Sequence, residues 1–274
     1  MKRGILALVF LCSLITAQAQ SLFLMSADTS YMQSKGFVNL DFGGEYRSSA
    51  LNNRFMEKLI FGGKIDGDDK EVVNRKLKDI NRLGGVADIN LSYYSFIDTL
   101  LGSDKWGMKI NIEDCYDLSY NFPEDFYRLL FEGNKQFAGK SVDFSEMSTD
   151  LVVFQKFGVG FFNKRNFSGA TLSYVNGQDY HSLAVHDAQL FTSEIGDSLH
   201  LRYNADYTRS DSSYTGLGTG NGSGAALDFI LNLPLAKNGG FISLEMENLG
   251  FIKWNDKTLH YHADSSVAYT GVDI

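Results

Sequence analysis

The chain has 274 residues, with 33 acidic against 25 basic side chains and a net charge of −8 at pH 7. Acidic chains are poor partners for nucleic acid, which is bound through basic surfaces. The sequence is rich in Gly, Tyr and Phe (27, 14 and 21) and has only two Pro, which favours strands and turns. We therefore expect an all-β protein that does not bind nucleic acid.

The first 19 residues have the form of a secretory signal. Lys2 and Arg3 precede an apolar run at residues 5–15, which is too short to span a membrane. An A-x-A cleavage site follows at residues 17–19, so we expect removal of residues 1–19. Losing two positive charges and no negative ones changes the net charge from −8 to −10. Cys115 is then the one remaining cysteine, so no disulfide framework is expected.

Alternating apolar and polar residues recur along the mature chain and predict about ten strands. Most neighbouring strands are separated by turns of hairpin length, which indicates an antiparallel sheet. The expected strands are residues 38–42, 87–93, 106–113, 151–162, 167–176, 181–192, 198–207, 225–235, 241–254 and 259–269.

Two segments have the spacing of short helices instead. In residues 71–83 the apolar side chains follow a helical period, and a Gly-Gly pair supplies the stop. In residues 123–137 a Pro-Glu-Asp sequence opens a second apolar-faced stretch. We expect both to be helical inserts that cover their apolar faces as plugs or caps.

The strand at residues 225–235 shows the pattern most clearly. Its odd positions are all apolar, and it has about the nine to eleven residues that a tilted strand needs to cross a bilayer. Export by the signal and aromatic residues at strand ends favour a membrane barrel over a soluble sandwich. We expect Leu227, Phe229, Leu231 and Leu244 to face lipid.

Charged residues on the opposite faces of these strands are candidates for the barrel lumen. Their mixed signs suit a hydrated or salt-bridged interior better than an ion-selective ring. The lumen-facing candidates are Asp88, Lys109, Glu113, Arg202, Asp206, Asp228, Glu245 and Glu247.

No catalytic, cofactor or metal site is predicted. The glycine run at residues 220–225 fits a dinucleotide fingerprint, but it lacks the preceding buried strand and the following helix. His260 and His262 share one face of a strand, while His181 and His186 lie on opposite faces. These residues do not supply the three or four ligands of a zinc site. Ser182 and Ser198, near histidines, do not make a convincing nucleophilic pair, so an enzyme is not expected.

Several runs carry a resemblance to a known family. They are the Ala-Gln-Ala-Gln end of the signal and residues 133–140, 142–145, 172–177, 216–228, 247–254 and 270–274. The sequence resembles uncharacterised outer-membrane barrel proteins of Gram-negative bacteria that use type IX secretion and gliding motility. It is more distantly similar to long-chain fatty-acid transporter barrels, which pass hydrophobic ligands. The resemblance implies an outer-membrane location and no assigned chemistry.

Two functions stay open at this stage. One is a porin-like barrel that transports hydrophobic or small solutes, and the other is a non-transporting scaffold that binds proteins of a surface secretion or motility machine. Residues 20–274 are expected to be one barrel domain, the N-terminal portion of a longer barrel, because the last strand is irregular and the final aromatic residue, Tyr269, is not terminal. An open, curved sheet whose first and last strands do not pair is the expected result.

Overall fold

The computed structural model describes residues 35–100, 102–211, 220–235 and 241–271. Three features discussed above lie outside these residues: the signal at 1–19, the start of the glycine run at 216–219 and the terminal residues 272–274.

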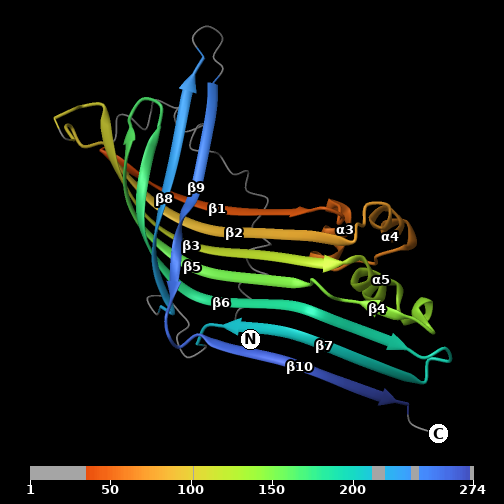
Figure 1. Ribbon diagram of the computed structural model, residues 1–274. Coiled ribbons are helices and arrows are strands. Elements are labelled where there is room, and N and C mark those ends of the chain that lie inside the picture. Colours follow the sequence, from red (N-terminus) through yellow and green to blue (C-terminus); the bar gives the residue numbers. More distant parts are fainter. Residues whose placement is uncertain (1–34, 101, 212–219, 236–240, 272–274) are drawn as a thin grey trace.

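The described residues form one antiparallel sheet, which confirms the all-β class (Figure 1). The predicted strands lie largely within observed ones, but residues 167–176 and 181–192 belong to a single strand, β6, and not to two. The strands are β1 (Gly36–Ser48), β2 (Ile80–Ser95), β3 (Trp106–Pro123), β4 (Ser141–Asp143), β5 (Ser148–Asn163), β6 (Gly169–Thr192), β7 (Ser198–Arg209), β8 (Gly222–Pro234), β9 (Phe241–Trp254) and β10 (Leu259–Thr270).

The sheet divides at β6. Residues 169–177 of β6 pair with β8, and residues 181–192 pair with β7. β8 then pairs with β9, and β7 with β10. β7 and β8 therefore act as one long strand with an interruption, and β9 and β10 act as a second. In Figure 1 the β8–β9 hairpin rises away from β7 and β10. We call the whole sheet the wall.

The wall is open within the described residues. The main strand order is β1-β2-β3-β5-β6-β7-β10, in which β1 pairs with β2 and β10 with β7, and neither has a second partner strand among the described residues. This is the open arrangement that the sequence predicts. The last strand, which the sequence shows as least regular, pairs with β7 over its whole length.

Three helices gather at one end of the wall. α3 (Asn53–Phe61) and α4 (Gly67–Asn74) connect β1 to β2, and α5 (Glu124–Glu132) follows β3, with the 3₁₀ helix η2 (Asn134–Phe137) after it (Figure 1). Phe55, Met56, Val73 and Tyr127 form their common apolar core. We call α3, α4 and α5 the helical cap. None of the described helices is long and apolar enough to cross a membrane.

The helix predictions are right in one place and wrong in another. Residues 123–137 contain α5 and η2, as expected. The helix predicted at residues 71–83 is wrong: α4 ends at Asn74 and β2 starts at Ile80. α3 was not predicted, although Asn52 caps its first turn by accepting a hydrogen bond from the Phe55 N–H. The helices bury their apolar faces against one another at the end of the sheet (Figure 1). They therefore form a cap and not a plug.

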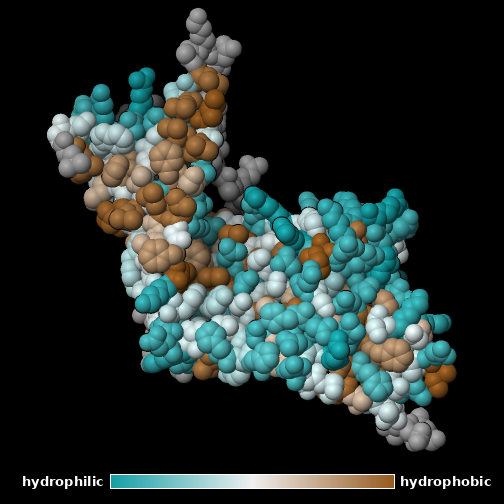
Figure 2. Space-filling model, in the orientation of Figure 1, coloured by the Kyte–Doolittle hydropathy of each residue, from teal (hydrophilic) through white to brown (hydrophobic). Residues whose placement is uncertain are grey.

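The two faces of the wall have the reverse of the usual polarity. On the outer face Val38, Leu172 and Phe251 are 67, 65 and 68 % exposed. On the inner face Lys156 and Ser173 are only 1 % exposed. Figure 2 shows hydrophobic side chains gathered over the β8–β9 arm and hydrophilic ones over the broad lower part of the wall. Soluble domains bury apolar side chains and expose charged ones, and this sheet does the opposite.

Candidate functional site

The inner face is most tightly packed where β3, β5, β6 and β8 meet. β5 has glycine at positions 158 and 160 on this face. A Cβ atom at Gly158 would lie 2.1 Å from Asn111 Oδ1 and 2.7 Å from Ser173 Oγ. A larger residue there would displace these side chains, because the polar side chains of the neighbouring strands lie directly over the β5 backbone.

Lys156 of β5 is the centre of the site. Its ammonium group lies 3.0 Å from Glu113 Oε2 on β3 and 3.2 Å from Asp228 Oδ2 on β8. The Cys115 thiol donates to Glu113 Oε1 at 3.1 Å. A buried ammonium group is tolerated only when carboxylates compensate it. Lys156 thus joins three strands that are distant in sequence.

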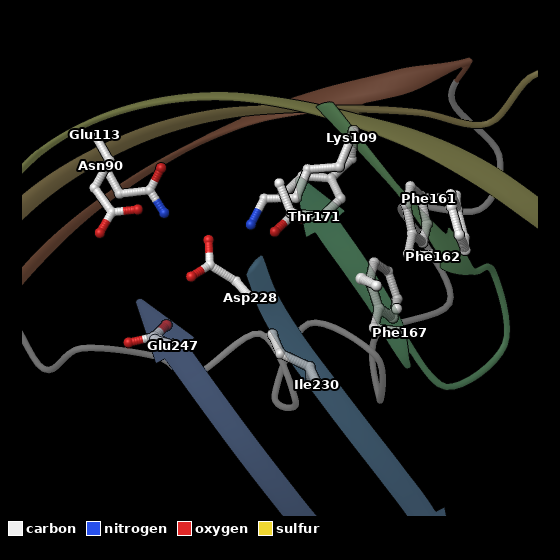
Figure 3. Close-up of a pocket in the computed structure, with 13 residues that line it drawn as sticks. Asn90, Lys109, Glu113, Phe161, Phe162, Phe167, Thr171, Asp228, Ile230 and Glu247 are labelled. Carbon is white, nitrogen blue, oxygen red and sulfur yellow. The ribbon is translucent and has the colours of Figure 1, made fainter. Parts of the chain in front are cut away.

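A bulge in β9 holds Asp228 in position. The register between β8 and β9 shifts between Leu227 and Phe229, where Asn248 has a left-handed φ of 58°. The Asn248 backbone N–H donates to Asp228 Oδ1 at 2.8 Å. Bulges often redirect a side chain next to a functional site. Here the bulge also brings Glu247 to the same inner region (Figure 3).

Aromatic rings form one side of the site. Tyr94 stacks on Phe37 at 4.8 Å between ring centroids, and Phe162 stacks on Phe167 at 5.3 Å. The Lys109 ammonium group lies 5.6 Å from the Tyr94 ring centroid. In Figure 3 the Lys109 amine points toward Asp228. The aromatic residues at strand ends were expected to favour a membrane barrel, but Tyr94, near the end of β2, is buried on the inner face.

These side chains line a partly open cavity of about 40 Å³. Its lining is aromatic at one end (Tyr94, Phe162, Phe167) and charged at the other, where Glu113, Asp228 and Glu247 face inward with Lys109 (Figure 3). A water molecule needs roughly 10–15 Å³, so the cavity has room for water or for a small ligand group. It is an amphipathic pocket, apolar and acidic on opposite sides.

The predicted lumen residues divide into two groups. Glu113, Lys109, Asp228 and Glu247 line the pocket, and Asp88 lies on the same inner face next to Gly43. Glu245 is two residues before Glu247 on β9 and does not line the pocket.

The second group lies on β7, away from the pocket. Arg202 pairs with Asp187 at 2.7 Å. Asp206 accepts from His186 at 2.7 Å and from His262 at 2.8 Å, so one carboxylate joins histidines of β6 and β10. His181 contacts Asp179 and the Tyr207 hydroxyl instead. No group of three or more His, Cys, Asp and Glu side chains is arranged to hold a metal in the part of the chain that the structure describes.

Sequence reasoning missed the central residue. Lys156 is the one charged side chain between Leu151 and Phe162, and a lone lysine in an apolar strand is the signal that could have indicated it. The aromatic side of the pocket was not predicted, because residues 94, 162 and 167 become neighbours only through strand pairing.

The class that fold and site define is an open antiparallel sheet with an apolar outer face and a charged inner pocket. A family model described as "Family of unknown function (DUF5723)" matches residues 29–274. The chain belongs to this family. No curated protein and no solved structure matches the chain.

Proposed function

We propose that the wall is part of an outer-membrane β-barrel whose inner face carries small or hydrophobic solutes. The reversed burial supports this most directly: charged Lys156 is buried on one face, while large apolar residues on the other are more than half exposed. Each exposed apolar side chain would lose about 25 cal/mol per Å² of favourable burial in water. Lipid on the outer face removes this penalty.

Strand length supports the same proposal. β1, β8 and β9 have 13, 13 and 14 residues, and a tilted strand crosses the bilayer core in about nine to eleven. A soluble sandwich would bury the apolar faces of two sheets against each other. In the described residues a single sheet is present, and its apolar face has no second layer.

Fractionation of cells that produce the full chain tests the location. We expect the processed protein in the outer-membrane fraction, extracted only by detergent, and running faster on gels before boiling than after it. Recovery as a soluble, monomeric periplasmic protein would overturn the barrel proposal.

One observation favours a second function, in which the wall binds a protein partner. A polar row crosses the outer face, where Asp114, Gln155, Asn176, Ser223 and Lys253 are successive partners on β3, β5, β6, β8 and β9. Beyond this row lies another apolar area that includes Leu190, Leu201 and Val267. β6 has 24 residues, or roughly 80 Å, which is more than one bilayer core can cover. The lower area would then contact protein.

Cysteine labelling in lipid vesicles separates the two functions. Two single cysteines are placed in a Cys115→Ser background. Leu172→Cys lies in the apolar area on the β8 side of the polar row, called the upper area, and Leu201→Cys lies in the area beyond the row, called the lower area. With no partner present, a membrane-impermeant maleimide should label position 201 and not position 172 if the lower area is a partner surface. Protection of both positions would show that lipid covers both areas and would remove the support for a partner.

A further inference from the structure

We propose that the inner pocket binds an organic ammonium group, with the attached apolar part of the ligand against the aromatic side. This inference rests on the proposed transport function and specifies its substrate class. The pocket has one acidic and one aromatic side, and a ligand that fits both has a positive charge next to a ring or short hydrocarbon.

The charges of the pocket favour a cation. Three carboxylates, Glu113, Asp228 and Glu247, line it, and the two nearby lysines are Lys109 and Lys156. Lys156 is already shared between Glu113 and Asp228. Glu247 has no ion pair with any residue in the described part of the chain, and Figure 3 shows its carboxylate pointing into the pocket. Asp88 adds further negative charge on the same face.

Buried polar groups without partners are a second and independent observation. Asn111 lies between Lys109 and Glu113 on the inner face of β3 and is 2 % exposed. Among the described residues, neither atom of its side-chain amide has a hydrogen-bond partner, and neither does the hydroxyl of Ser173, which lies across Gly158 from it. Unsatisfied polar groups of this kind usually mark a place that water or a ligand occupies. They lie beside the acidic side of the pocket.

The aromatic side fits the rest of such a ligand. Tyr94 and Phe162 pack edge to face at 5.2 Å, and the stacked Phe167 continues the surface. The Lys109 ammonium group already lies over the Tyr94 ring, so the apolar part of the ligand would pack against Phe162 and Phe167. A carboxylate ligand would meet three carboxylates of like charge instead, which disfavours fatty acids.

Binding of small probes to the purified full chain in neutral detergent tests the proposal. The probe is benzylammonium, and benzoate and benzyl alcohol are the anionic and neutral controls of similar size. Calorimetric titration should show saturable binding of benzylammonium and at least tenfold weaker binding of the two controls. Equal or tighter binding of benzoate would overturn the proposal.

Two matched variants locate the site. Glu247→Gln removes the unpaired carboxylate without breaking an ion pair, and we expect it to weaken benzylammonium binding at least tenfold. Glu245→Gln, two residues away and outside the pocket, should change it less than twofold. Equal effects, or no effect of Glu247→Gln in a protein that still shows the heat-dependent gel shift, would contradict the assignment.

The two proposals can fail separately. Ammonium binding by a soluble protein would overturn the membrane proposal and keep the binding site. A membrane protein that does not prefer the ammonium probe would overturn the binding site and keep the membrane proposal.

Discussion

The helical cap and the wall are built from one chain but have opposite polarity. In the cap Phe55 and Val73 are fully buried, and ion pairs such as Arg75 with Glu71 lie on the surface. In the wall the ion pairs of Lys156 are buried and the large apolar side chains are exposed. Under the proposed function, the cap folds as a water-soluble protein does, while the wall is arranged for lipid outside and water inside.

The largest difference between the two regions is expected for deletion of an apolar side chain. Phe55→Ala should destabilise the cap by about 3–5 kcal/mol, because the ring is fully buried against Tyr127 and Phe131. Phe229→Ala on the outer face, where the ring is 37 % exposed, should cost much less. Denaturant titration of each variant measures the change in unfolding free energy, and limited proteolysis reports separately on unfolding of the cap. Similar costs at the two positions would contradict the contrast.

Removal of a buried charge from the wall should destabilise the protein about as much as Phe55→Ala destabilises the cap. Lys156→Ala removes the ion-pair partner that Glu113 and Asp228 share, and we expect a loss of about 3–5 kcal/mol in unfolding free energy. Lys58→Ala in the cap removes a lysine whose side chain is 22 % exposed, so its loss should be smaller. If the two losses are equal in denaturant titrations, burial of charge does not distinguish the regions.

Placing a charge on the outer face tests the lipid side. Leu231 on β8 lies opposite Leu244 on β9. Near the bilayer midplane, Leu231→Arg should reduce the free energy of unfolding by about 2–4 kcal/mol. Glu245→Arg, on the inner face of the neighbouring strand, is the control and should cost less. Reversible unfolding from lipid vesicles measures both values. A larger penalty for the inner substitution would reverse the assignment of the faces.

The smallest effect is an acid sensitivity confined to the cap. Asp66 caps α4 by accepting from the Asp69 N–H at 3.0 Å, and it also pairs with Lys58 at 3.3 Å. These interactions lower the pKa of Asp66 from 3.8 to about 2. A lowered pKa stabilises the fold above the unfolded value, and this stabilisation is lost as the pH falls from about 4 through about 2. Proteolysis of the cap should increase in this range, and Asp66→Asn should flatten the increase.

Much of the wall could be predicted from alternation alone. Apolar and polar residues alternate in most of the long strands, and this pattern is local, so it needs no knowledge of the fold. The division of β6 between two partners could not be predicted. It depends on the register of β7 and β8, which is a property of the pairing and not of either strand by itself.

The wrong helix has a specific physical cause. Val73, Leu77 and Leu83 follow a helical spacing, and all three do pack against the same apolar cluster. They reach it from α4, the following linker and β2, so a shared core produced the spacing that one helix would also have produced. The pocket shows the same limit: four of its charged residues were among the candidates, but Lys156, which joins two of them, was identified only by the structure.

The direction of the strands has a consequence for closing the wall. The named strands all pair antiparallel, so the seven positions from β1 to β10 in the main strand order alternate in direction, and β1 and β10 run the same way. Joining them directly would create one parallel seam. An all-antiparallel barrel, the rule for bacterial outer-membrane proteins, instead needs an odd number of additional long strands, whatever their source. Under the proposed function, the number of strands in a closed barrel that contains this wall must therefore be even.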